Sequence, residues 1–314
     1  MKLKLEGLIA APFTALHRDG SLNLDAIEQQ AEHLKSNRVN GAFICGTTGE
    51  GLSLSTEERR KVGERWVAAA KGRLKIIVHV GHNSLVESRE LARHAQQIGA
   101  DAFATLAPSF FKPNRIELLV SFCAEVAAAA SELPFYFYHM PAMTGVNLSM
   151  PEFLAAAGKR IPNLAGTKFT DENLMSYAQC VALENGRYNI LFGRDEMLLA
   201  ALALGATGAV GSTYNFMAPL YHEVIDAFHQ GDLAAARSSQ LKANELIGIM
   251  SRYGGLPAGK AMMAMAGVDC GPVRLPLSDL SKEALEAFRR ELQGSGFPLP
   301  SPGSTPARAK GHKN

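Results

Sequence analysis

The sequence predicts an α/β protein, a (β/α)8 TIM barrel with a C-terminal helical extension. Eight short apolar runs lie along about 210 residues, with amphipathic helical patterns between most of them, which is the signature of this fold. After the eighth apolar run the pattern becomes helical only, which predicts the extension. A doubly wound sheet is the alternative architecture, but no G-x-G-x-x-G motif follows the first apolar run.

The expected strands are short apolar runs bounded by turn residues: Leu8–Ala11, Gly41–Cys45, Ile76–Val80, Ala102–Leu106, Phe135–Tyr138, Leu164–Phe169, Ile190–Phe192 and Ala209–Val210. The expected helices between them have apolar residues on one face: Leu24–Ser36, Thr56–Ala70, Leu85–Ile98, Ile116–Ala130, Met150–Ala157 and Leu174–Leu183. Ser55 with Glu58, and Ser149 with Glu152, have the spacing of a capping box at a helix start.

The chain divides into three expected parts. Residues 1–218 hold the barrel strands and most of the helices, and residues 219–293 hold the last barrel helix and the C-terminal helices. Residues 294–314 are rich in Gly, Pro, Ser and basic residues, so we expect a disordered tail.

Charge and hydropathy exclude two classes of partner. The net charge is +2, and the last 21 residues contribute Arg308, Lys310 and Lys313 without an acid, so the rest of the chain is near −1. A nearly neutral body argues against a nucleic-acid surface. No apolar run approaches the ~20 residues that span a membrane.

The cysteines and the first residues predict a cytoplasmic location. The four cysteines, Cys45, Cys123, Cys180 and Cys270, are scattered without metal-type spacing, as buried thiols in a reducing compartment are. The first residues superficially resemble a signal peptide, but Glu6 interrupts the apolar region, so they are better interpreted as leading into the first strand.

Lys168 lies in an apolar run, Leu164–Thr170, that predicts a buried strand. Side chains alternate across a strand, so Gly166, Lys168 and Thr170 share one face. Burial lowers the pKa of a lysine, and a neutral amine attacks carbonyls to form a Schiff base. The alternative is a lysine whose stem lies on the core while its amine reaches water.

Other polar residues follow the expected strands, where a barrel carries its chemistry. These residues are Thr47, Thr48, Tyr138, Thr170, Asp195, Glu196 and Ser212. The threonine hydroxyls with nearby backbone N–H groups suit a carboxylate, the tyrosine suits proton relay, and the acids suit sugar hydroxyls. Each also has an ordinary alternative as a capped turn, a core tyrosine or a surface acid. Their joint placement on one barrel carries the hypothesis.

The histidines do not predict a catalytic metal. His79 and His82 resemble a ligand pair, but residues three apart on a strand face opposite sides. A metal-dependent aldolase needs several converging His or acidic ligands. His139 directly follows Tyr138, so its side chain is expected to face the other way.

At these residues the chain resembles the N-acetylneuraminate lyase branch of the dihydrodipicolinate synthase superfamily. The resemblance covers roughly residues 5–292. The matching motifs are Gly46-Thr47-Thr48-Gly49-Glu50-Gly51-Leu52-Ser53, Tyr138-His139-Met140-Pro141-Ala142-Met143-Thr144-Gly145, Gly166-Thr167-Lys168-Phe169-Thr170, Gly193-Arg194-Asp195-Glu196, Gly211-Ser212-Thr213-Tyr214-Asn215 and Gly271-Pro272-Val273-Arg274-Leu275-Pro276-Leu277.

The resemblance implies a carbon–carbon lyase, a class I aldolase that cleaves N-acetylneuraminate reversibly to N-acetylmannosamine and pyruvate. It implies a homotetramer that needs no metal and no organic cofactor. The implied catalytic residues are Lys168, Tyr138 and Thr47. The implied substrate-binding residues are Thr48, Thr170, Gly193, Asp195, Glu196 and Ser212.

Two departures from the superfamily bear on the substrate. Dihydrodipicolinate synthases place an arginine in the loop after the strand-five tyrosine, and here Met143 stands there, which disfavours aspartate semialdehyde. Where they have a Tyr-Tyr pair this chain has Phe110-Phe111, and phenylalanine cannot relay a proton. The alternatives are a pyruvate aldolase for a 2-keto-3-deoxy acid, a dihydrodipicolinate synthase and, more distantly, a non-catalytic keto-acid or sugar-acid binding protein.

Overall fold

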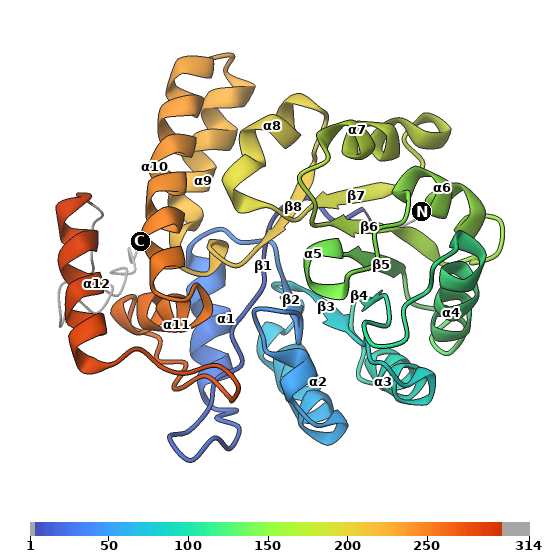
Figure 1. The fold of residues 1–314 in the computed structure, drawn as a ribbon, viewed down its shortest axis with the longest axis horizontal. Helices are drawn as coiled ribbons and strands as arrows, with labels where there is room; N and C mark the ends of the chain where they lie inside the picture. The colour runs from blue at the N-terminus through green and yellow to red at the C-terminus, as the bar shows by residue number, and fades with distance from the viewer. Residues whose placement is uncertain (1–3, 297–314) are drawn as a thin grey trace, which may run out of the picture.

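The computed structural model describes residues 4–296, in which parallel strands close into a barrel in the order β1 to β8 (Figure 1). The last strand pairs with the first, from Gly7 with Gly208 to Ala10 with Gly211. The strands are β1 Gly7–Ala10, β2 Gly41–Ile44, β3 Lys75–His79, β4 Ala102–Leu106, β5 Phe135–His139, β6 Leu164–Phe169, β7 Asn189–Phe192 and β8 Gly208–Gly211. The predicted barrel is confirmed, with strand ends that differ by at most one residue.

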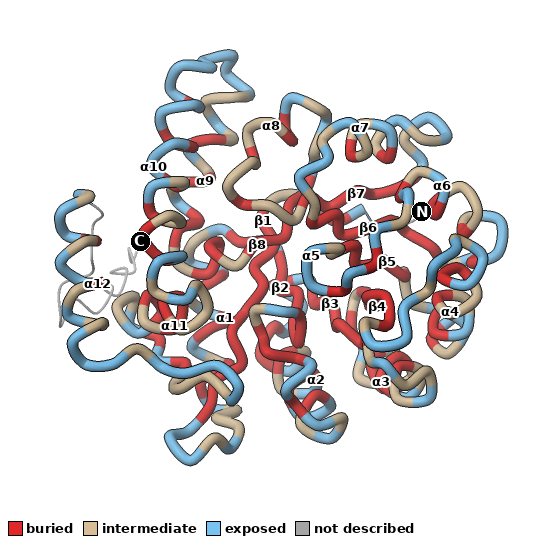
Figure 2. The backbone as a smooth tube through the Cα atoms, viewed as in Figure 1, coloured by how far each residue is buried: buried red, intermediate tan, exposed pale blue. Residues whose placement is uncertain are grey.

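Helices cover the outside of the barrel, and the strands form its buried centre (Figure 2). The helices are α1 Ala26–Ser36, α2 Thr56–Ala70, α3 Leu85–Gln97, α4 Ile116–Ala128, α5 Pro141–Thr144, α6 Met150–Ala157, α7 Leu174–Ala182, α8 Leu198–Ala203, α9 Tyr214–His229, α10 Leu233–Arg252, α11 Leu256–Met265 and α12 Lys282–Gly294. The six helices expected from the sequence are all present, with ends that differ by up to two residues.

Two apolar layers hold the barrel. Outward-facing strand residues pack under the helices, while inward-facing residues fill the barrel interior. Tyr136 and Tyr138 both lie in the inner layer, because residues two apart on a strand share a face. His139 faces the outer layer, as the strand alternation predicted, and lies against Phe137 and Phe169. A packed interior gives the carboxyl ends of the strands a rigid floor.

One of the two predicted capping boxes forms. Ser55 Oγ accepts a hydrogen bond from Glu58 N at 3.1 Å, and Glu58 Oε2 accepts one from Ser55 N at 2.8 Å. Ser149 occupies the predicted cap position of α6, but its side chain makes no capping hydrogen bond, so the helix start is confirmed and the capping box is not. Pro151 lies within the first turn and has no N–H, which leaves the serine one donor fewer to accept from.

The C-terminal extension packs α10 against α9 and α12 and returns to the barrel at α11 (Figure 1). The last barrel helix, α9, begins at Tyr214 and includes Pro219, so the expected division at 218/219 falls inside it. Residues 268–281 were expected to be helical and are not. Of the expected tail, residues 297–314 lie outside the described residues. Within residues 4–296, no helix is long and apolar enough to cross a membrane.

Candidate active site

A cavity of about 320 Å³ lies at the carboxyl ends of the barrel strands. It brings together all nine residues that the sequence singled out: Thr47, Thr48, Tyr138, Lys168, Thr170, Gly193, Asp195, Glu196 and Ser212. These residues come from the ends of β2, β5, β6, β7 and β8 and the loops that follow them. The polar residues that the barrel rule selected therefore lie together at the expected end of the barrel, and Gly193, which the resemblance implied, lies with them.

Lys168 points from β6 into this cavity and is almost fully buried, with 4% of its surface exposed. Its Nζ lies 4.1 Å from the centroid of the Tyr138 ring and 4.3 Å from that of Phe43. Burial lowers the pKa of Lys168 from the ordinary 10.5 to about 7, although the Asp195 carboxylate opposes this shift. A substantial fraction of the amine is therefore neutral and nucleophilic near pH 7.

The Tyr138 hydroxyl lies beside the Thr47 hydroxyl. The two oxygens are 3.1 Å apart, and the tyrosine also donates to Met140 Sδ at 2.8 Å. Burial raises the pKa of Tyr138 to about 12, against the opposing effect of hydrogen bonds with Thr47 and Thr170. At neutral pH the phenol is therefore protonated, and it transfers a proton only where a partner accepts one.

The turn that carries Thr47 and Thr48 is tightly folded. Glu50 adopts a left-handed conformation with φ of 53°, and its N–H donates to Thr47 O at 3.0 Å. A Cβ at Gly51 would lie 1.8 Å from Cys45 O, so only glycine lets the turn close on the end of β2. Thr47 is consequently exposed to the cavity, and Thr48 is partly exposed.

Asp195 and Glu196 are adjacent in sequence but lie in different environments. Asp195 is buried, and its Oδ2 accepts hydrogen bonds from Thr213 N at 2.9 Å and Thr213 Oγ1 at 2.6 Å. Burial raises the pKa of Asp195 to about 6, although both bonds from Thr213 oppose the shift. Glu196 is half-buried, with Oε1 3.3 Å from Arg194 Nη1. Glu196 is the more available acceptor for a ligand hydroxyl.

Comparison with known proteins agrees with this geometry. The model of the dihydrodipicolinate synthetase family matches residues 4–295. The chain belongs to the dihydrodipicolinate synthetase family. The N-acetylneuraminate lyase of Mus musculus is 45% identical to this member of the family over 306 residues, which cover 96% of this chain and 95% of the mouse protein.

Solved structures of the same family extend the comparison. Proteus mirabilis N-acetylneuraminate lyase superposes with a TM-score of 0.92 at 44% identity, covering 94% of this chain and 100% of that one. A catalytic lysine mutant of Ruminococcus gnavus sialic acid aldolase superposes with a TM-score of 0.88 at 28% identity, covering 93% of this chain and 95% of that one. The expected family and fold are thus confirmed.

The three residues that differ from those expected in dihydrodipicolinate synthases, Phe110, Phe111 and Met143, lie outside the cavity. Met143 is on α5 with 64% of its surface exposed, and Phe110 and Phe111 are 77% and 85% exposed in the loop after β4. None of the three lines the cavity of the described chain. Neither an arginine clamp nor a tyrosine relay is therefore supplied from these positions.

In the sequence, His79 stood out only as a possible metal ligand, whereas the structure places its ring against the Tyr138 ring. The two rings meet edge to face, with centroids 5.6 Å apart at 89°. His79 Nδ1 lies 2.9 Å from Cys45 O, and burial holds the pKa of His79 well below its usual value. A neutral histidine therefore packs against the Tyr138 ring. In residues 4–296 no three His, Cys, Asp or Glu side chains cluster as metal ligands.

One wall of the cavity comes from the C-terminal extension. Ile247, Met250 and Ser251 on α10 and Leu256 at the start of α11 line it. Their sequence pattern is that of ordinary helices, so no signal distinguished them as site residues. Gln240 on α10 also holds the β7 loop, donating to Asp195 O at 3.2 Å. The extension therefore completes the site and supports the loop that carries Glu196.

Proposed function

We propose that this chain is a class I aldolase that cleaves N-acetylneuraminate reversibly to N-acetylmannosamine and pyruvate. The observation that carries the proposal is the buried Lys168, whose pKa of about 7 makes its amine a nucleophile at neutral pH. Family relatives at 45% and 44% identity are N-acetylneuraminate lyases, and a catalytic lysine is named in the Ruminococcus gnavus enzyme.

The reaction begins when the open-chain sugar acid presents its ketone to neutral Lys168. The amine adds to the carbonyl carbon, water leaves, and the protonated Schiff base that results withdraws electrons from the adjacent carbon. Thr47 and Thr48 hold the carboxylate next to the ketone with their hydroxyls and the nearby N–H groups. Removal of the C4 hydroxyl proton then breaks the C3–C4 bond and leaves an enamine on Lys168.

The proton of the C4 hydroxyl leaves through Tyr138. Because the phenol is protonated at neutral pH, it accepts this proton only while it passes its own to another group. The substrate carboxylate beside Thr47 is the acceptor that the geometry offers, since the Thr47 and Tyr138 oxygens are 3.1 Å apart. Protonation of the enamine and hydrolysis of the imine then release pyruvate.

The rest of the cavity suits the polyol. Thr170, Gly193, Asp195, Glu196 and Ser212 surround the opening above Lys168 and offer hydroxyls, a carboxylate and backbone groups. A Cβ at Gly193 would lie 2.0 Å from Thr170 Oγ1, so glycine keeps this side of the cavity open. In this proposal the reaction needs no metal and no organic cofactor, and the protein acts as a homotetramer in the cytoplasm.

The rival substrates are separated by a direct assay. The purified protein is incubated with N-acetylneuraminate, with a 2-keto-3-deoxy acid, and with pyruvate plus aspartate semialdehyde. We expect release of pyruvate and N-acetylmannosamine from the first, and little reaction with the others. Efficient condensation with aspartate semialdehyde and negligible cleavage of N-acetylneuraminate would contradict the proposal and place the chain with the synthases of its family.

A further inference from the structure

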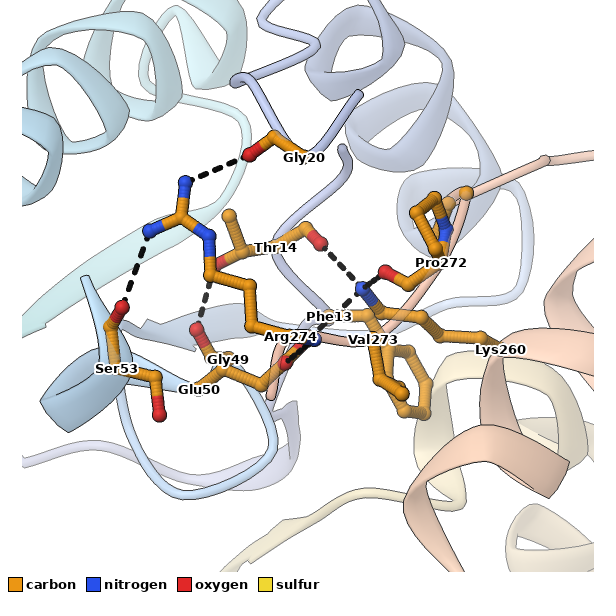
Figure 3. A network of polar contacts seen from close by, with 12 residues as sticks. Phe13, Thr14, Gly20, Gly49, Glu50, Ser53, Lys260, Pro272, Val273 and Arg274 are labelled. Carbon is orange, nitrogen blue, oxygen red and sulfur yellow. Dashed lines mark hydrogen bonds and ion pairs between the residues drawn. The ribbon is translucent and has the colours of Figure 1, made fainter. Parts of the chain in front are cut away.

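A buried ion pair lies outside the cavity, against the turn that carries Thr47 and Thr48. Lys260 Nζ on α11 is 2.9 Å from Glu50 Oε1, and the side chains are 4% and 2% exposed (Figure 3). Removing two charges from water costs several kcal/mol per ion, so a buried pair is weak evidence for stability in itself. Its place next to the turn suggests another role.

Lys260 joins three segments that are far apart in the sequence. Its ammonium group pairs with Glu50 after β2 and donates to the carbonyls of Thr14 after β1 and Pro272 after α11 (Figure 3). The ammonium group thus donates two hydrogen bonds to backbone carbonyls and is neutralised by the Glu50 carboxylate. A fixed cation at this point holds the C-terminal extension against two loops of the barrel.

Glu50 transmits this attachment to the turn. Its Oε2 accepts a hydrogen bond from Arg274 N at 2.7 Å, while its own N–H donates to Thr47 O at 3.0 Å. The preceding residue is also fixed, because Thr14 Oγ1 donates to Gly49 O at 2.6 Å. Both the side chain and the backbone of Glu50 are therefore tied, within three residues of the Thr47 hydroxyl.

We propose that Glu50 and Lys260 are positioning residues for carboxylate binding. The pair holds the Gly46–Gly51 turn so that the hydroxyls of Thr47 and Thr48 meet the carboxylate next to the reacting ketone. This inference rests on the proposed function only in that a 2-keto acid binds at Lys168. Neither residue lines the cavity, so each acts through the turn.

The test uses pyruvate alone, which carries the ketone and the carboxylate but no polyol. The full-length protein is inactivated with borohydride over a range of pyruvate concentrations, which gives a half-saturating concentration and a limiting rate. In Glu50→Gln we expect the half-saturating pyruvate concentration to rise about tenfold to a hundredfold, the loss expected for a hydrogen bond to a charged group. The limiting rate should stay within about twofold, because Lys168 is untouched.

Glu58→Gln is the matched control. Glu58 binds the guanidinium of Arg274 at 2.8 Å and so ties the same C-terminal segment to α2 instead of the turn. This variant should lower the melting temperature and leave the half-saturating pyruvate concentration unchanged. An equal rise in both variants would show that any loosening of the segment suffices, which would overturn the specific role of Glu50.

The double variant Glu50→Gln/Lys260→Met separates positioning from stability. Glu50→Gln alone leaves the Lys260 charge buried and unpaired, which should lower the melting temperature. The double variant removes both charges, so its melting temperature should be closer to that of the wild type. The half-saturating pyruvate concentration should remain raised several-fold. A double variant in which both the melting temperature and the half-saturating pyruvate concentration return to wild-type values would overturn the proposal. A failure of both Glu50→Gln and the double variant to fold would also overturn it. A wild type that traps no pyruvate would instead refute the proposed aldolase function.

Discussion

At the scale of single residues, burial gives Lys168 and Tyr138 complementary properties. The same desolvation lowers the pKa of the lysine to about 7 and raises that of the tyrosine to about 12. A lysine is deprotonated and a phenol kept protonated because burial disfavours the charged form of each. In the proposed mechanism these two residues are the nucleophile and the proton carrier at the same pH.

The pH dependence of cleavage should report Lys168. Only the neutral amine attacks the ketone, so kcat/KM for N-acetylneuraminate should rise with pH and level off above an apparent pKa of about 7. Asp195→Asn removes the carboxylate that opposes the shift and should move this limb to lower pH. A profile that is flat between pH 6 and 8 would contradict the assignment.

Tyr138→Phe should lower kcat by roughly 10²–10⁴-fold, the range for a positioned acid–base group. Tyr136→Phe is the control, because it removes a buried hydroxyl from the same strand face. The Tyr136 hydroxyl donates to Asn189 Oδ1 at 2.8 Å, away from the cavity, so this variant should keep near-native kcat. Near-native turnover in Tyr138→Phe would show that its hydroxyl carries no proton.

At the scale of elements, strand alternation predicted which side chains face the barrel interior, and the barrel rule predicted which of them meet. Strand alternation placed Lys168 and Tyr138 in the interior and turned His139 outward, because side chains alternate along a strand. The left-handed Glu50 and the buried position of Asp195 could not be predicted. Loop conformation depends on contacts with distant segments, such as Asp195 with Thr213, which no local pattern encodes.

The loop after β7 should determine binding of the polyol. Glu196→Ala should raise KM for N-acetylneuraminate, since a site that hydrogen-bonds hydroxyls weakens when an acceptor is removed. Glu172→Ala is the control, because Glu172 also pairs with Arg194 but does not line the cavity. It should leave KM unchanged. Pyruvate trapping should be normal in both variants, and a loss of trapping in Glu196→Ala would contradict a role limited to the polyol.

At the scale of the whole molecule, the closed barrel could be predicted from eight apolar runs. The irregular segment 268–281, which runs back to the barrel, could not be predicted from the sequence. That segment has no periodicity, and it is held by contacts such as Arg274 with Glu58, which lie 216 residues apart in sequence. Long-range polar contacts of this kind carry no local signature. The C-terminal wall of the cavity was missed because its residues on α10 and α11 have the pattern of ordinary helices.

The buried amine should also cost the molecule stability. Below pH 7 Lys168 is protonated in both the folded and the unfolded chain, so the full penalty of burying the charge applies. Above pH 7 the folded amine is neutral, and the remaining penalty is the cost of removing the proton that the unfolded chain still holds. This cost falls as the pH rises from about 7 to 10.5. Lys168→Met should therefore raise the free energy of unfolding by a few kcal/mol at pH 7 and by much less at pH 10. Equal gains at both pH values would contradict the lowered pKa.

Mass mapping of the borohydride-reduced protein tests the central claim most directly. The protein is treated with borohydride in the presence of pyruvate, digested, and examined for a reduced pyruvate adduct. We expect loss of activity and an adduct on the peptide that contains Lys168, with no adduct in Lys168→Met and no loss of activity from a chelator. An adduct on a different lysine, or inactivation by the chelator alone, would contradict a Schiff-base mechanism at Lys168.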